Sequence, residues 1–272
     1  MISVVTFKWK PKPGYRSQFD SAHVNTMMRM VARHYRKPHR FICVTDDPTG
    51  LDGAVEYVPL WNDCATLANP TWPNGPSCYR RLKVFSKEFA EVAGPRFICM
   101  DLDMVIVDDL APIFDRPEPF LIFKTHLPSI PICGSMFMVN AGEFSDVWDR
   151  FDPIESPLRA KAAGHRGSDQ GWLALNFGKD VAGWGSAEGV HSYMQLVPRM
   201  SKFALAHAQE QATRRLSEKE RIERIRRRIY TTGLSQVGAL PAGSRIIVFT
   251  GKPDPWDEEA LKLSPWIREH YR

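Results

Sequence analysis

The sequence predicts an α/β fold in which helices flank both faces of a mostly parallel, mixed sheet of the Rossmann-like kind. Short apolar runs recur along the chain, as they do in strands that are buried on both faces. Segments with helical spacing of apolar residues lie between these runs, and this alternation is typical of a parallel sheet between helices. The chain has 272 residues, which is enough for one large core.

The first half of the chain begins with a predicted strand over Ile2–Phe7. A helix is predicted over Ser21–His34, and a second strand over Phe41–Thr45 ends in two aspartates and a proline. Residues 61–77 are rich in proline and asparagine and are predicted to form a loop. The next predicted helix, Cys78–Val92, carries its apolar residues on one face and stops before a Gly-Pro pair.

The second half starts with the apolar runs Phe97–Met100 and Met104–Val107, which flank two aspartates. A helix is predicted to begin after Ser168, whose hydroxyl is a suitable N-cap, and to close at Gly178. This helix spans about Asp169–Leu175. The remaining predicted elements are the strands Phe120–Phe123, Ser135–Val139 and Arg245–Phe249 and the helix Ser217–Tyr230.

We expect a single domain over residues 1–256, with a basic helical insertion at about 201–232 and a C-terminal tail over 257–272. Hydrophobic residues make up 43% and charged residues 25% of the chain, as in ordinary globular proteins. No stretch approaches the ~20 apolar residues of a membrane span, and the start of the chain does not resemble a signal peptide. The five cysteines are scattered and form no CxxC pair, which favours a reducing, cytoplasmic setting over a zinc or disulfide framework.

The net charge of +5 is concentrated in one segment. Residues 214–228 hold eight basic and three acidic side chains, 8 − 3 = +5, so the rest of the chain is close to neutral. Such a patch suits an anionic partner, namely nucleic acid, an anionic glycan or a lipid surface. A solvated helix with i,i+4 pairs such as Glu220–Arg224 explains the same pattern, and the sequence leaves both interpretations open.

The segment Phe97–Leu110 is the most informative part of the chain because two carboxylates follow a buried strand. Along an extended chain, Asp101 and Asp103 would point the same way, with Leu102 pointing back. Two carboxylates so close suit a hard divalent cation, Mn²⁺ or Mg²⁺, that also takes phosphate oxygens. The competing interpretation is a strand end with two solvated or ion-paired acids.

Ligands of parallel sheets lie at the carboxyl ends of strands, so the loops that follow strands are the predicted site. These loops are 8–12, 46–47, 101–103 and 251–256. Lys252 follows Gly251, which lets the backbone approach a ligand closely, and its ammonium could neutralise a diphosphate as a point charge. An exposed loop lysine is the alternative.

Five segments resemble, in order, the motifs of glycosyltransferases with the GT-A fold, above all the glycogenin-like and bacterial lipopolysaccharide galactosyltransferase group. The resemblance covers roughly residues 1–256, and the segments read CYRRLKVF, CMDLDMVIVDDL, CGSMFMVNAG, GSDQGWL and IIVFTGKPDPW. The resemblance implies a metal-dependent enzyme that moves a sugar from a nucleotide-sugar donor, a UDP-sugar, to an acceptor hydroxyl with retention.

The resemblance also implies roles for the residues that match these motifs. Asp101 and Asp103 would hold the metal ion, and Asp101 would also reach the ribose. Asp169 and Gln170, in the first turn of their helix, would form the reaction centre, where the helix dipole favours a carboxylate. Helix capping is the alternative role for Asp169. Ser135 lies on the strand that would contact the donor sugar.

The remaining donor-binding candidates are predicted to contact the nucleotide part of the donor. Phe7 and Lys8 precede Trp9 in the loop that could enclose the base. By resemblance, Asp46 would accept hydrogen bonds from the base, although an Asp-Asp-Pro turn explains it equally well. Arg81 is the candidate for the phosphate or ribose, and its neighbour Arg80 is an alternative because the helical register is unknown.

The sequence departs from the family pattern at two points. The relatives place a histidine before the closing glycine as a third metal ligand, whereas this chain has Val-Phe-Thr there, and His191 and His126 are the candidate substitutes. Cys133 and Gly134 precede Ser135 where an asparagine is expected. Both departures concern contacts to the donor and its metal ion.

The acceptor is the least determined part of the prediction. The first hypothesis is a bacterial surface glycan or lipid-linked sugar, with the basic helix against anionic lipid as a peripheral membrane contact. The second is a phage-type enzyme acting on hydroxymethylated bases of DNA. A non-catalytic sugar-nucleotide or nucleic-acid binding protein is the third, and a metal-dependent nuclease is a weaker fourth. In each of the first two, the anion-binding candidates are Arg221, Arg224, Arg227 and Arg228.

Overall fold

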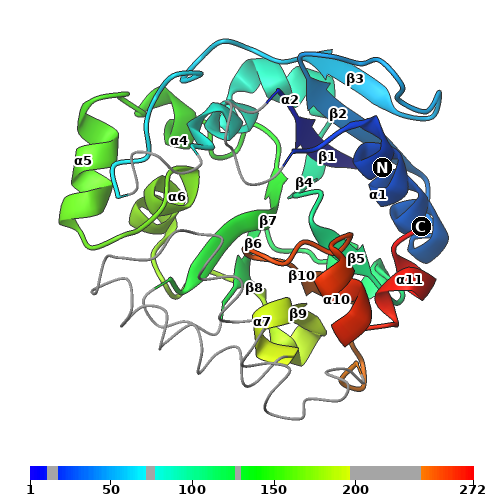
Figure 1. The fold of residues 1–272 in the computed structure, drawn as a ribbon. Coiled ribbons are helices and arrows are strands. Elements are labelled where there is room, and N and C mark those ends of the chain that lie inside the picture. Colours follow the sequence, from blue (N-terminus) through cyan, green and yellow to red (C-terminus); the bar gives the residue numbers. More distant parts are fainter. Residues whose placement is uncertain (11–17, 72–76, 126–129, 197–239) are drawn as a thin grey trace.

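Two sheets form the centre of the structure, a computed structural model that describes residues 1–10, 18–71, 77–125, 130–196 and 240–272 (Figure 1). The larger sheet has seven strands in the order β3-β2-β1-β4-β7-β6-β8, and the smaller has three in the order β5-β10-β9. The strands of the larger sheet are β1 (Ile2–Lys8), β2 (His39–Thr45), β3 (Glu56–Pro59), β4 (Arg96–Met100), β6 (Phe120–Lys124), β7 (Ile132–Asn140) and β8 (Gly183–Trp184). Those of the smaller sheet are β5 (Met104–Ile106), β9 (Val190–Ser192) and β10 (Ile246–Val248).

The larger sheet is mixed, with a parallel half that positions the candidate site. Strand β1 pairs in parallel with β2 and with β4, and β2 pairs in parallel with β3. Strand β7 is antiparallel to both β4 and β6. Because β1, β2 and β4 run in one direction, their carboxyl ends meet at one edge of the sheet, where ligands of such sheets bind.

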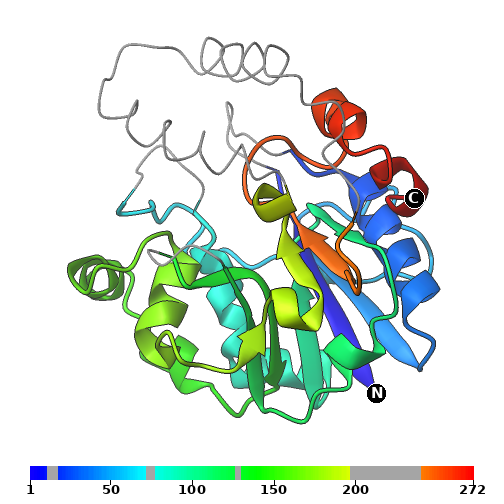
Figure 2. The same ribbon diagram turned by 90° about the horizontal axis from the view of Figure 1, so that it is seen from below.

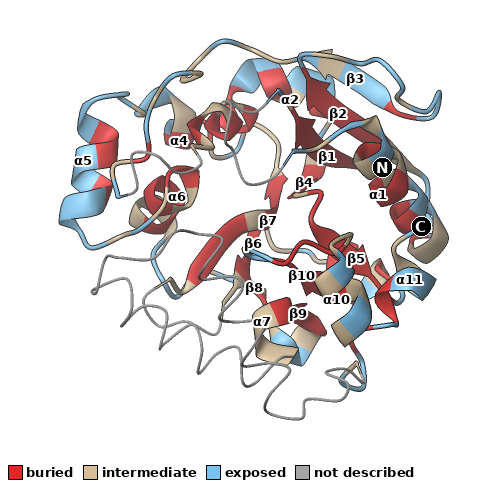
Figure 3. Cartoon of the chain, viewed as in Figure 1, coloured by how far each residue is buried: buried red, intermediate tan, exposed pale blue. Residues whose placement is uncertain are grey.

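Alternate side chains of the large sheet enter two separate hydrophobic cores. In β1, Val4 belongs to one core, whereas Val5 and Phe7 belong to the other. Since both faces are buried, the strands read as continuous apolar runs in the sequence rather than as alternating patterns. Figure 3 shows the central strands buried and the outer surfaces of the peripheral helices exposed.

Different elements cover the two faces. The Val4 face is covered by α1 (Ser21–His34), the smaller sheet, α10 (Glu258–Leu263) and α11 (Ile267–His270). The Phe7 face is covered by the 3₁₀-helix η1 (Tyr79–Phe85), α2 (Lys87–Ala93), α4 (Asp146–Asp149) and α6 (Asp169–Phe177). Figure 2 shows α11 beside α1 and far from α6. The other helices are α3 (Ala111–Phe114), α5 (Glu155–Ala162), η2 (Ser186–Glu188) and α7 (Tyr193–Leu196).

The predicted α/β fold with a mostly parallel, mixed sheet is confirmed, and several elements match closely. Helix α1 spans the predicted residues because its N-cap is strong: Asp20 accepts a hydrogen bond from the His23 amide, and the His23 ring accepts one from the Asp20 amide. The strands predicted over Ile2–Phe7, Phe41–Thr45 and Arg245–Phe249 correspond to β1, β2 and β10 with small shifts at their ends.

The single helix predicted over Cys78–Val92 is wrong in one respect. The segment forms two helices, η1 and α2, that meet at Ser86. The Ser86 hydroxyl accepts a hydrogen bond from the Phe89 amide at 3.2 Å and so begins a new helix. The tighter winding of η1 changes the directions of its side chains, which decides which arginine reaches the candidate site.

Residues 257–272, predicted as a C-terminal tail, form α10 and α11. Ala260 and Ile267 are fully buried against the core beside α1. Arg33 of α1 donates a hydrogen bond to the His270 carbonyl at 3.0 Å, and a second one to the carbonyl of Arg272. These contacts fasten the end of the chain to the first helix.

The whole of the predicted basic insertion, 201–232, including its helix Ser217–Tyr230, lies outside the described residues. The same holds for Arg221, Arg224, Arg227 and Arg228 and for His126, so their predicted roles stay predictions. Across the part of the chain that the structure describes, no helix combines the length and apolarity needed to span a membrane.

Candidate active site

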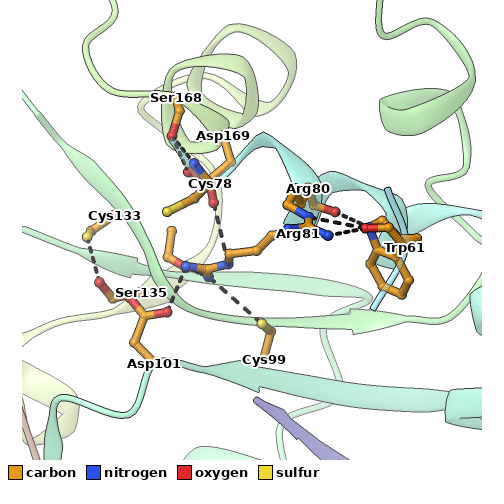
Figure 4. Close-up of polar contacts among 11 residues, drawn as sticks. Trp61, Cys78, Arg80, Arg81, Cys99, Asp101, Cys133, Ser135, Ser168 and Asp169 are labelled. Atoms are coloured by element: carbon orange, nitrogen blue, oxygen red, sulfur yellow. Dashed lines mark hydrogen bonds and ion pairs between the residues drawn. The ribbon is translucent and has the colours of Figure 1, made fainter. Parts of the chain in front are cut away.

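A buried arginine connects the predicted metal-binding strand to the predicted reaction centre. Arg81 of η1 donates a hydrogen bond to the Asp101 carboxylate at 2.7 Å and lies 3.5 Å from a carboxylate oxygen of Asp169. Its guanidinium also donates to the Gly134 carbonyl and contacts the Cys99 sulfur at 3.8 Å. Figure 4 shows the side chain of Arg81 extended between Asp101 and Asp169. Residues distant in sequence therefore meet around one cation.

The adjacent arginine points elsewhere. Arg80 donates to the backbone carbonyl of Trp61, and the Trp61 indole donates to the Arg80 carbonyl at 2.6 Å (Figure 4). In a 3₁₀-helix, successive side chains are about 120° apart, so only one of the two can face the sheet edge. The structure selects Arg81, and Arg80 instead fastens the loop after β3.

The charges of this cluster are strongly coupled. Burial by itself lowers the pKa of Arg81, but Asp101 and Asp169 outweigh it and hold that pKa well above its ordinary value. Desolvation raises the pKa of Asp101 despite the opposing effects of Arg81 and of a hydrogen bond from Ser135. The side chains of Arg81 and Asp169 are only 6% and 8% exposed, whereas that of Asp101 is 29% exposed. Asp101 is therefore the more accessible of the two carboxylates that contact Arg81.

The start of β7 holds Asp101 from the other side. The Asp101 amide donates to the Ser135 carbonyl at 2.9 Å, and the Ser135 hydroxyl contacts the Cys133 thiol at 3.3 Å. Burial raises the pKa of Cys133 to about 11, so this thiol is neutral at physiological pH. Ser135 thus lies beside Asp101, and its contact with the donor stays a prediction.

The start of α6 brings Asp169 and Gln170 against the same strand. A Cβ atom on Gly134 would lie 3.3 Å from an Asp169 carboxylate oxygen and 3.5 Å from the Gln170 Cβ, so a side chain there would crowd both residues. Gln170 donates weakly to the Arg166 carbonyl at 3.4 Å. The glycine of the Cys-Gly-Ser segment therefore permits the close approach of the two predicted reaction-centre residues.

Ser168 does not act as the predicted side-chain cap of α6. Its hydroxyl accepts a hydrogen bond from the Cys78 amide at 2.8 Å and contacts the Asp169 carboxylate at 3.1 Å. This bond links the start of η1 to the start of α6 across 90 residues of sequence. Ser168 thereby orients Asp169 toward Arg81.

Asp101 and Asp103 have different surroundings because the chain bends between β4 and β5 rather than continuing as a strand. Asp103 is buried, and its carbonyl accepts a hydrogen bond from the Phe249 amide of the segment after β10 at 3.0 Å. Burial raises the pKa of Tyr271, and the carboxylates of Asp103 and Asp254 add to this effect. Asp103 therefore lies toward the C-terminal segments, and Asp101 toward Arg81.

No group of three histidine, cysteine or acidic side chains that could hold a metal ion occurs in the part of the chain that the structure describes. His191, one candidate third ligand, lies in β9 opposite Ile247 of β10, and burial lowers its pKa. The lowered pKa leaves a neutral imidazole, but the structure gives no cluster in which it joins Asp101 and Asp103.

Lys252 is bound within its own loop. Its ammonium lies 2.6 Å from Asp254 and 3.1 Å from Asp257. Gly251 precedes it with φ of 108°, a value that favours glycine. The sequence analysis did not include Asp254 and Asp257, although the acidic residues of the PDPWD segment were the available signal.

The carboxyl ends of β1 and β2 carry the predicted base-binding residues. Phe7 is buried and contacts the rings of Trp9 and Trp61 edge to face at 6.0 and 5.8 Å. The Lys8 ammonium donates to a backbone carbonyl of the loop after β2. The exposed Asp46 accepts a hydrogen bond from the Lys10 amide at 3.1 Å. The two loops are thus joined, and the binding of a base there stays a prediction.

The structure also adds residues that the sequence analysis did not single out. The Cys99 thiol and the Gly134 carbonyl both contact the Arg81 guanidinium, and Cys78 connects to Ser168. Neither a buried thiol nor a backbone carbonyl carries a sequence signal of its own. Only the position of Cys99, two residues before Asp101, could have indicated its place.

Comparison with known proteins identifies the fold. No protein-family model and no curated protein matches the sequence. Among solved structures, galactosyltransferase LgtC in complex with donor and acceptor sugar analogs is 13% identical, with a TM-score of 0.58 over 96% of this chain and 91% of that chain. A glutamine-to-glutamate active-site mutant of LgtC is 13% identical, with a TM-score of 0.56 over 94% and 90% of the two chains.

The glycosyltransferase GlyE of Streptococcus pneumoniae is a further structural neighbour. It is 11% identical, with a TM-score of 0.51 over 94% of this chain and 56% of that chain, so the match spans about half of GlyE. The predicted GT-A fold is confirmed by these likenesses: the chain shares the fold of LgtC and GlyE.

Proposed function

We propose that the protein is a glycosyltransferase that moves a sugar from a nucleotide-sugar donor, a UDP-sugar, to an acceptor hydroxyl with retention. The observation that carries this proposal is the meeting of Asp101, Arg81 and Asp169 at the carboxyl edge of a sheet with the GT-A fold. The LgtC structure contains donor and acceptor sugar analogs, which supports sugar transfer as the chemistry of this fold.

A divalent ion, Mn²⁺ or Mg²⁺, fits the acidic residues of the site. Asp101 and Asp103 supply hard oxygen ligands, and Asp101 is partly exposed. Mg²⁺ is commonly held by one or two carboxylates together with water and substrate phosphates, so a third protein ligand is not required. The ion would act as a Lewis acid that neutralises charge on the departing diphosphate. Asp101 and Asp103 would hold it.

The remaining donor contacts follow from the positions of the strand ends. Phe7 and Lys8 lie beside Asp46, where the aromatic rings and the carboxylate suit a nucleobase. Gly251 and Lys252 follow β10, which is hydrogen-bonded to the Asp103 segment, and the ammonium suits a diphosphate. Ser135 beside Asp101 suits the ribose or the donor sugar.

Asp169 and Gln170 are the proposed reaction centre. The Asp169 carboxylate is oriented by Ser168 and by Arg81, so it occupies one defined position at the start of α6. There it can accept hydrogen bonds from sugar hydroxyls and stabilise positive charge that develops at the anomeric carbon. Gln170, the next residue of the helix, would approach the same face of the donor.

We propose a bacterial surface glycan or lipid-linked sugar as the acceptor. The LgtC complex, which holds an acceptor sugar analog, favours a glycan over other acceptors. Transfer to hydroxymethylated bases of DNA is the alternative outcome of an acceptor screen. Binding of the donor without hydrolysis or transfer would instead indicate a non-catalytic binding protein.

The experiment compares the wild type with Asp169→Asn, which keeps the shape of the side chain and removes its charge. We expect UDP binding, measured by titration calorimetry with Mn²⁺, to change by less than about threefold. Donor hydrolysis and transfer should fall by about a hundredfold or more, because the charge acts mainly in the transition state. Asp146→Asn, an exposed acid of α4, is the matched control. Unchanged turnover together with lower thermal stability would leave Asp169 a structural residue.

A further inference from the structure

The ammonium of Lys252 is shared between two carboxylates of the same loop. Asp254 lies 2.6 Å and Asp257 lies 3.1 Å from the nitrogen. The Asp257 carboxylate also accepts a hydrogen bond from the Asp254 amide at 2.8 Å, which folds the loop back on itself. Partial burial lowers the pKa of Lys252, but the two carboxylates outweigh it and raise that pKa, so the side chain is a cation at physiological pH.

The two carboxylates differ in how readily they can give up the cation. The side chain of Asp254 is 1% exposed, whereas those of Asp257 and Lys252 are 30% and 35% exposed. Removing a cation from a deeply buried carboxylate is strongly unfavourable. A carboxylate with access to water loses little when its partner leaves. Asp257 is therefore the exchangeable partner and Asp254 the permanent one.

The loop that carries Lys252 lies next to the proposed metal-binding segment. The Phe249 amide donates to the Asp103 carbonyl at 3.0 Å, three residues before Lys252. Lys252, whose side chain is 35% exposed, is thus carried by the loop that follows this backbone contact with the segment proposed to hold the metal ion of the donor.

We propose that Asp257 is a positioning residue that holds Lys252 in the donor-free protein and is replaced by the diphosphate of the donor. The proposal rests on the function proposed above. An ammonium group has three N–H donors, so Lys252 can keep Asp254 and exchange one bond from Asp257 to a phosphate oxygen. No covalent step is involved, because one anion replaces another on the same cation.

The exchange has a defined effect on donor affinity. Every donor that binds must displace Asp257, so the free-energy cost of that displacement offsets part of the attraction between Lys252 and the diphosphate. Exposed ion pairs contribute about 0.2–1 kcal/mol, which corresponds to a factor of about 1.4 to 5 in affinity. Removing the negative charge of Asp257 should therefore tighten donor binding, although it removes a contact seen in the free protein.

The test measures binding of UDP and of inorganic pyrophosphate, each with Mg²⁺, by titration calorimetry. In Asp257→Asn, the side-chain oxygen can still accept from the Asp254 amide, while the competing charge is gone. The matched control is Glu258→Gln, which makes the same change of net charge one residue along. Glu258 pairs with Lys262 at 3.2 Å on α10, and its side chain is 82% exposed. Asp257→Glu is the conservative variant, because it keeps the negative charge of the wild type.

We expect Asp257→Asn to bind both ligands about two- to fivefold more tightly than the wild type. Glu258→Gln and Asp257→Glu should stay close to the wild-type affinity. In a Lys252→Met background the effect of Asp257→Asn should disappear, since the competition requires the cation. A merely structural role of Asp257 would weaken binding in both backgrounds.

Three results would overturn the exchange. Equal or weaker UDP binding by Asp257→Asn, with wild-type binding intact, overturns the exchange and leaves the proposed function standing. Failure of both proteins to bind UDP and pyrophosphate overturns the exchange and the proposed function together. Persistence of the affinity gain in the Lys252→Met background also counts against it.

Discussion

Replacing Arg81 by methionine tests the electrostatic centre of the candidate site. The substitution removes one short hydrogen bond to Asp101 at 2.7 Å, the ion pair with Asp169 at 3.5 Å and the bond to the Gly134 carbonyl. It leaves two carboxylates that are 29% and 8% exposed without their cation. Removing one partner of a buried ion pair costs about 3–5 kcal/mol in the free energy of unfolding. Two acids share this arginine, so we expect a loss in that range at pH 7.

The loss should depend on pH in a defined direction. Desolvation already raises the pKa of Asp101 above its ordinary value of 3.8, and removing the cation should raise it further. The folded variant would then hold a proton that the unfolded chain releases, so its stability should increase as the pH falls toward the ordinary value. The difference between wild type and Arg81→Met should therefore shrink as the pH is lowered from 7 to about 4.5.

Urea denaturation at both pH values measures this difference, with Arg80→Met as the control. Arg80 is the neighbouring residue, and among the described residues its side chain hydrogen-bonds the Trp61 carbonyl alone, so its loss should be about 1–2 kcal/mol and independent of pH. A loss below about 1 kcal/mol for Arg81→Met at pH 7, or an equal loss at both pH values, would refute the assignment.

Two further predictions concern the metal ion and the acceptor. Asp103→Ala should lower transfer by about a hundredfold or more and remove the dependence of UDP affinity on Mn²⁺, while the protein still folds; near-normal turnover would exclude Asp103 as a ligand. Replacing Arg221, Arg224 and Arg227 by glutamine should leave donor hydrolysis intact, lower transfer to an anionic acceptor and flatten its salt dependence. Loss of DNA retardation in this triple variant would favour a DNA acceptor, loss of liposome binding a lipid-linked one, and no change would mean that the segment does not bind the acceptor.

Much of the fold could be predicted from local sequence. The inner strands of the larger sheet are buried on both faces, so each appears as an apolar run in the sequence, whereas the edge strand β3 is mostly exposed. The start of helix α1 was predictable because the capping bonds of Asp20 and His23 lie within four residues of one another. The parallel strands also indicated the sheet edge at which the functional loops meet.

The directions of individual side chains depended on tertiary structure. The sequence could not distinguish Arg80 from Arg81, because the segment winds as a 3₁₀-helix only where Ser86 separates it from α2. The chain likewise bends at residues 101–103 instead of continuing as an extended strand, so the alternation of a strand could not give the directions of the two carboxylates. Small changes in backbone winding rotate a side chain by tens of degrees, and packing decides them.

By itself, the sequence determined the fold class and five of the seven strands of the larger sheet, and it predicted the loops of the candidate site. The tertiary structure alone decided which charges meet. Arg81 contacts Asp169, which lies 88 residues away in sequence, and the Cys78 amide donates a hydrogen bond to the Ser168 hydroxyl, which lies 90 residues away. A charged side chain is attracted to any opposite charge within reach, so its partner is set by the three-dimensional path of the backbone and not by its neighbours in sequence.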